Sequence, residues 1–146
     1  MVAFVKNIIV FLFLGFILAF ASIELESDFL SDFHKSNLVN ILITLLAINT
    51  ATSSIVLTKL KDLGDKNNFD FKDSFSELKT AILEQVILIC LAIIFSILGE
   101  SKVIENNLKY NEIIFLTLNS AIFIYAIDIL RDTANSIFII LKLKDK

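Results

Sequence analysis

Two residue types that often perform chemistry occur only once in the sequence, as His34 and Cys90. One histidine and one cysteine are too few for a structural zinc site, which usually takes four such ligands. His34 lies in an acidic stretch between Phe33 and Lys35, where a serine–histidine–aspartate site would also need a rigidly held nucleophile. We interpret His34 as part of an outer loop and Cys90 as a small buried hydrophobic residue.

Acidic side chains around His34 offer oxygen ligands: Glu24, Glu26, Asp28 and Asp32. Such carboxylates could bind a divalent cation weakly, but a solvated acidic loop explains the same residues. The phosphate-binding, dinucleotide-binding, zinc-protease and nucleophile-elbow motifs do not occur in the sequence. We therefore predict no catalytic residue, no cofactor and no metal site, and a protein that is not an enzyme. The net charge of −3 argues against direct binding of nucleic acid, which usually requires a basic patch.

The remaining residues are mostly apolar and fall into four long runs. The composition is 56% hydrophobic and contains no proline, whereas soluble domains are roughly 45–50% apolar. A spanning helix needs about 20 predominantly apolar residues, and four segments approach or reach that length: 2–21, 38–57, 81–98 and 113–130. The sequence therefore predicts an all-α membrane protein, a single domain over residues 1–146 with four transmembrane helices.

Lysine and arginine residues indicate which loops face the cytoplasm. The N-terminus, the middle loop and the C-terminal tail carry ten of them, and the other two loops carry three. We therefore expect a multi-pass protein of the bacterial inner membrane with both termini in the cytoplasm. The first run also fits a signal peptide, with Lys6 before the apolar stretch and residues 19–21 as the cleavage site.

Three of the predicted helices should extend beyond the bilayer on the cytoplasmic side. We expect the second to begin at a Ser36 or Asn37 cap and to end before Gly64. The third should begin with a capping box at 74–77. The apolar stripes of these extensions either pack on one another or bind a partner protein. The extensions comprise residues 58–80 and 131–146.

Polar residues within the spans are the candidates for function, because ionisable groups are costly in a membrane. Those residues, with a neighbouring arginine, are Asn49, Glu84, Asn119, Asp128 and Arg131. For Glu84 and Asp128 we favour a place at the inner membrane boundary, with Arg131 spaced to form an ion pair along the helix. The two asparagines are expected to form interhelical hydrogen bonds. The alternative is that they line a water-filled pore.

Small residues recur at spacings of three and four along the second span: Thr44, Ala47, Ala51 and Ser54. In lipid, such a face lets two helices approach closely. The stripe therefore predicts helix packing, either within one subunit or between the subunits of a homo-oligomer.

The layout of the whole chain resembles a class of small four-helix bacterial membrane proteins used against phage. The shared features are size, four spans, an acidic first outer loop, a Ser/Thr/Ala-rich segment at 45–63, a charged inner loop and a polar-studded last span at 113–143. Two kinds of protein in this class are the KwaA subunits of the Kiwa system and the RexB-type exclusion proteins. Resemblance to KwaA implies a homo-oligomeric membrane sensor that signals to a cytoplasmic effector. Resemblance to RexB implies an ion channel that depolarises the infected cell.

Our leading hypothesis is a non-enzymatic, oligomeric membrane subunit of an anti-phage defence system. It would sense an envelope event and recruit or regulate a cytoplasmic effector protein. A channel-like effector that depolarises the cell is the alternative, and an assembly or immunity factor for another membrane complex is a third reading. The candidate contacts for a cytoplasmic partner are Lys59, Lys61, Lys66, Lys72, Lys79, Lys142 and Lys144.

Overall fold

The computed structural model describes residues 2–67, 71–101 and 111–144, and these residues form helices joined by short turns. The helices are α1 (Val2–Glu24), α2 (Phe29–Asn67), α3 (Lys72–Gly99) and α5 (Asn111–Lys144). Each is long and apolar enough to cross a membrane. The described residues thus confirm the predicted all-helical fold and the class of multi-pass membrane proteins.

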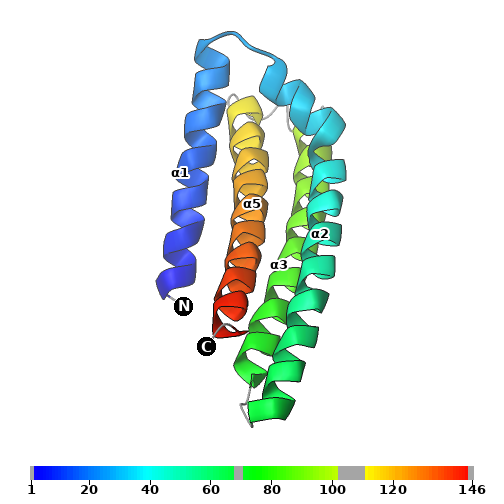
Figure 1. Ribbon diagram of the computed structural model, residues 1–146. Helices are drawn as coiled ribbons and strands as arrows, with labels where there is room; N and C mark the ends of the chain where they lie inside the picture. Colours follow the sequence, from blue (N-terminus) through cyan, green and yellow to red (C-terminus); the bar gives the residue numbers. More distant parts are fainter. Residues whose placement is uncertain (1, 68–70, 102–110, 145–146) are drawn as a thin grey trace.

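Helix α5 lies in the middle of the bundle, with α1 on one side and the paired α2 and α3 on the other (Figure 1). Helix α1 packs mainly against α5 and makes few contacts with α2. Both chain termini lie at the same end of the bundle as the end of α2 and the start of α3 (Figure 1). We call this the inner end, and the opposite end, where α1 gives way to α2, the outer end.

Helix α2 is longer than the sequence led us to expect. It begins at Phe29 rather than at Ser36 or Asn37, and it continues through Gly64 to Asn67. The early start brings an additional buried residue, His34, into line with Leu38, one turn apart on the face of α2 that packs in the bundle. Glycine inside a helix costs only about 1 kcal/mol, which tertiary packing offsets. The predicted first outer loop is therefore reduced to the turn at 25–28.

The predicted capping box at the start of α3 is wrong. The helix begins at Lys72, and its N-cap is Phe71, which makes no side-chain capping hydrogen bond. The amide of Phe75 donates to the carbonyl of Phe71 at 3.0 Å, so Ser74 already lies within the first turn. Instead of a side-chain cap, this end of the helix has Phe71 packed against a buried cluster at the inner end.

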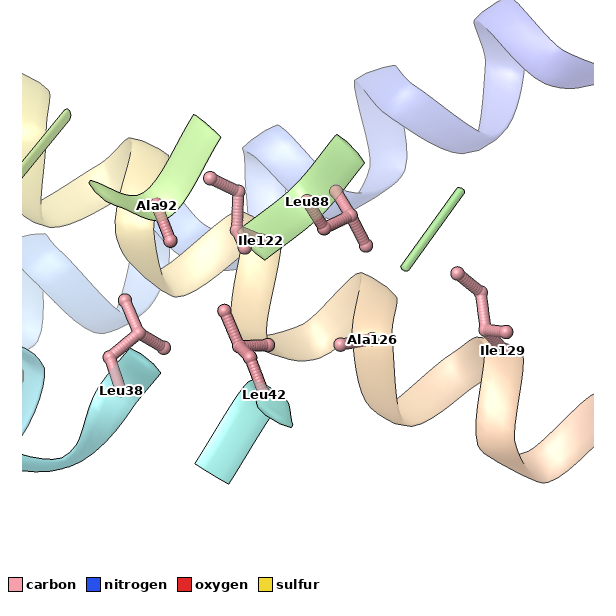
Figure 2. Packing of buried hydrophobic residues seen from close by; sticks show 7 residues of the cluster. All are labelled: Leu38, Leu42, Leu88, Ala92, Ile122, Ala126 and Ile129. Atoms are coloured by element: carbon pink, nitrogen blue, oxygen red, sulfur yellow. The ribbon is translucent and has the colours of Figure 1, made fainter. Parts of the chain in front are cut away.

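The main hydrophobic core lies between α2, α3 and α5. Figure 2 shows its buried side chains converging from the three helices: Leu38, Leu42, Leu88, Ala92, Ile122, Ala126 and Ile129. A second buried cluster near the inner end joins α2 to α3 and consists of Val56, Leu60 and Leu78. The inner-end parts of α2 and α3 therefore pack on one another. This is the first of the two alternatives for their apolar stripes, packing together rather than binding a partner protein.

Helix α1 is held against α5 by small residues. A Cβ atom added to Gly15 would lie 2.5 Å from the carbonyl oxygen of Thr117 and 2.8 Å from the amide nitrogen of Ala121. Ala19, one turn beyond Gly15, is fully buried. This is a small-x-x-x-small contact of the kind that brings membrane helices together. It gives α1 a close packing contact with α5 in the bundle.

The small-residue stripe of α2 faces away from the bundle, because Thr44, Ala47, Ala51 and Ser54 are all exposed. The hydroxyls of Thr44 and Ser54 donate to the carbonyls four residues earlier, each at 2.9 Å. Among the described residues, the stripe therefore lies outside the buried core, and packing between subunits stays a prediction. Cys90 is also exposed, so its interpretation as a buried residue is wrong; it lies on the face of α3 opposite the core.

Candidate functional site

Polar side chains are buried inside the bundle along the faces that α2, α3 and α5 turn toward one another. The buried ones are His34, Asn49, Ser53, Gln85, Asn119, Ser120 and Thr133. Buried polar groups are costly unless they are hydrogen-bonded. Their grouping at the outer end, in the interior and at the inner end defines the candidate site.

An amide pair joins α2 to α3 in the interior. Nδ2 of Asn49 donates to Oε1 of Gln85 at 3.0 Å, and both side chains are almost fully buried. This confirms the interhelical hydrogen bond expected for Asn49. Gln85 was not among the polar residues predicted from the sequence, although its seven-residue spacing from Leu78 and Ala92 places it on the buried face of α3.

Glu84, next to Gln85, points toward a different helix. Its carboxylate Oε2 accepts a hydrogen bond from the hydroxyl of Tyr125 on α5 at 2.9 Å. The ring of Tyr125 stacks on Phe11 of α1, with 4.9 Å between ring centroids. Residues from α1, α3 and α5 thus meet at one point, and Glu84 is a half-buried group bound to a partner. No pattern in the sequence indicated Tyr125 as that partner.

A cavity of about 620 Å³ opens at the inner end, lined mainly by α3 and α5 and also by Val56 and Leu60 of α2. Its wall contains four carboxylates: Glu77, Glu84, Asp128 and Asp132. Among the described residues that line it, none is basic. The charged groups of this cavity are therefore acidic, and residues of α2, α3 and α5 bound it.

Arg131 pairs with the two aspartates of this region. Its Nη2 lies 2.7 Å from Oδ1 of Asp128 and 3.1 Å from Oδ1 of Asp132. The Asp128–Arg131 pair has the i, i+3 spacing expected from the sequence. The arginine side chain is 65% exposed, so solvent and salt screen these ion pairs and they add little stability.

The outer end holds a second polar cavity of about 570 Å³, lined by His34, Asn119, Glu100 and Glu112 among others. His34 is therefore not in a loop, as the sequence suggested, but in α2, with only 4% of its surface exposed. Its Nε2 lies 3.5 Å from the hydroxyl of Ser120 on α5. Its Nδ1 has no hydrogen-bond partner among the described residues, so the carboxylate that orients a catalytic histidine is not found there.

Asn119 does not form the interhelical hydrogen bond expected of it through its carbonyl. Its Oδ1 is buried and has no partner among the described residues.

Between the outer cavity and the Asn49–Gln85 pair lie the apolar side chains of Leu38, Leu42 and other core residues. The polar groups thus form separate layers along the bundle rather than one continuous path.

The candidate lysines for a cytoplasmic partner gather at the inner end of α2 and α3. Lys59, Lys61, Lys72 and Lys79 are exposed there. The side chains of Lys66, Lys142 and Lys144 lie outside the described residues. The structure therefore brings four of the seven candidates to one end of a packed helical hairpin.

The acidic residues near the outer end do not converge on a common point. Glu24, Glu26, Asp28 and Asp32 are exposed along the end of α1, the turn and the start of α2. Within residues 2–67, 71–101 and 111–144, no three His, Cys, Asp or Glu side chains gather as metal ligands.

No known protein family, curated protein or solved structure matches the chain.

Proposed function

We propose that this protein is a non-enzymatic, oligomeric membrane subunit that senses an envelope event and recruits or regulates a cytoplasmic effector in bacterial phage defence. It lies in the inner membrane, with its inner end in the cytoplasm. The resemblance of the chain's layout to small phage-defence membrane proteins supports the biological setting. The excess of lysine and arginine at the inner end supports the orientation.

The observation that carries this proposal is the length and packing of the α2–α3 hairpin. Helix α2 has 39 residues and is roughly 58 Å long at 1.5 Å per residue. The hydrocarbon core of a bilayer is about 30 Å thick. The hairpin therefore extends well beyond the membrane core, and Val56, Leu60 and Leu78 hold its two helices together. A packed hairpin that carries exposed lysines presents a fixed surface to an acidic partner.

Charge reversal on this hairpin tests the proposal. We expect Lys59→Glu with Lys61→Glu to lower co-purification of a cytoplasmic protein about tenfold, because like charges then face each other across the contact. The measurement is a pull-down in mild detergent from cells that also express the neighbouring genes. Lys35→Glu is the matched control, since Lys35 is exposed near the outer end of the same helix. Recruitment that survives the double reversal, or no partner in fixed ratio, contradicts the proposal.

A channel-like effector is the second candidate function, and the polar cavities at both ends favour it. In that case Asn49→Leu or Asn119→Leu should abolish an ion leak through liposomes that contain the protein, because each replaces a buried polar group. Asn40→Leu is the control, since Asn40 is exposed on the surface of α2. The absence of any leak from the unmutated protein removes this candidate.

A further inference from the structure

An apolar groove of about 340 Å³ lies between α1, α3 and α5. Side chains from all three helices line it, including Phe11, Ile87 and Leu118. The groove exists because α1 packs mainly on α5 and stands apart from α3 (Figure 1). Along α5 it extends from Leu118 to Tyr125, which is roughly 10 Å at 1.5 Å per residue.

The apolar groove and the inner polar cavity adjoin. Glu84 and Tyr125 line both of them, and the hydrogen bond between their side chains stands at the junction. On one side of this bond the walls are almost wholly hydrocarbon, and on the other, carboxylates and hydroxyls stand among apolar side chains such as Leu60 and Ile129. A ligand that fills both spaces must therefore be an amphiphile, with an apolar tail in the groove and a polar head in the cavity.

The polar groups in the wall of the inner cavity are mainly hydrogen-bond acceptors. Its carboxylates accept only. The hydroxyls of Thr80, Thr133 and Ser136 already donate to backbone carbonyls of their own helices, at 2.9, 3.1 and 3.0 Å, so they offer lone pairs to the cavity. Because no basic residue is found among its described lining residues, the head that fits it carries a positive charge and several N–H donors. A primary ammonium group has both properties.

We propose that the groove and the inner cavity together bind one aminophospholipid, of the phosphatidylethanolamine type. Its ammonium group occupies the cavity beside Glu84, and one acyl chain lies in the groove between α1 and α3. The exposed guanidinium of Arg131, next to the cavity residues Asp128 and Asp132, supplies positive charge for the lipid phosphate. This site does not depend on recruitment of a partner protein. The leaflet it faces follows from the proposed orientation.

Two substitutions separate the parts of the proposed site. Glu84→Gln removes the charge that faces the ammonium group, while its carbonyl can still accept the hydrogen bond from Tyr125. Ile87→Trp fills the groove from α3, where Ile87 is 57% exposed. Ile55→Trp is the control, because Ile55 is 61% exposed on α2 and does not line the groove. Helix content by circular dichroism and elution volume show that each variant is folded.

The test is native mass spectrometry of the purified full chain with phosphatidylethanolamine and phosphatidylglycerol of the same acyl chains. We expect one phosphatidylethanolamine to be retained about tenfold better than phosphatidylglycerol, since charge-assisted hydrogen bonds are the strong ones. Glu84→Gln should abolish this preference, Ile87→Trp should lower retention of both lipids, and Ile55→Trp should change neither.

Three outcomes overturn the proposal. Equal retention of the two lipids by the unmutated protein shows only non-selective lipid contact. A preference that survives both Glu84→Gln and Ile87→Trp places the lipid elsewhere on the protein. Binding of glycerophosphoethanolamine, the head without acyl chains, as tightly as the intact lipid shows that the cavity takes a soluble amine instead.

Discussion

Gly15→Leu should separate α1 from α5 and destabilise the bundle by about 3 kcal/mol or more, at the upper end of the range for overpacked sites. Any side chain at this position would begin 2.5 Å from the carbonyl oxygen of Thr117 and 2.8 Å from the amide nitrogen of Ala121. Both are backbone atoms of a helix, so they cannot turn aside as a side chain can. The two helices must move apart, and the stacking of Phe11 on Tyr125 is lost with the contact.

The measurement is unfolding in mixed micelles, in which a denaturing detergent is added while helix content is recorded. Gly99→Ala is the control, because the three atoms nearest its added Cβ all belong to the side chain of Phe115, the closest at 3.3 Å. A side chain can shift by the few tenths of an ångström required, so a small effect is expected. If Gly15→Leu unfolds at the same detergent fraction as Gly99→Ala, the close approach of α1 to α5 does not exist.

Asn49→Leu should destabilise the bundle by about 1–3 kcal/mol, because it leaves the buried amide of Gln85 without its partner. Gln85→Leu should have a similar effect for the reciprocal reason. The double variant, Asn49→Leu with Gln85→Leu, should be closer in stability to the unmutated protein than the two single effects predict. Replacement of both polar partners by apolar groups of similar shape is often nearly neutral.

The same unfolding assay measures all four proteins of this double-mutant cycle. The coupling energy should reach about 0.6–1.7 kcal/mol, the range found for hydrogen bonds inside membrane proteins. Thr52→Leu is a suitable comparison on α2, since Thr52 is only half-buried. Strictly additive effects of the two single substitutions would mean that the amides do not interact.

The composition and the four apolar runs were enough to predict the helical class and the four long apolar helices of the described residues. A bilayer requires each spanning segment to satisfy its own backbone hydrogen bonds, so long apolar runs can hardly be anything but helices. The i, i+3 ion pair of Asp128 and Arg131 could also be predicted from the sequence, because both residues lie on one helix and the spacing alone sets their distance. The ends of the helices were harder to predict from the sequence. Phe71 stands as the N-cap of α3 because it packs on its neighbours, whereas the capping-box rule considers only the local sequence.

Contacts between helices were decided by the tertiary structure. The sequence marked Asn49 and Glu84 as polar groups in a membrane, but only helix packing assigned them to Gln85 and Tyr125. Gly15 and Ala19 could have been recognised as a packing motif, yet the sequence does not say which helix they meet. The register between two helices depends on how all their side chains fit together. The spacing of residues along one helix does not contain this information, because the contacts join residues that are far apart in the sequence. The sequence by itself therefore determined that the described chain forms four helices long and apolar enough to cross a membrane, and which of their residues are polar. The tertiary structure decided which of those residues meet.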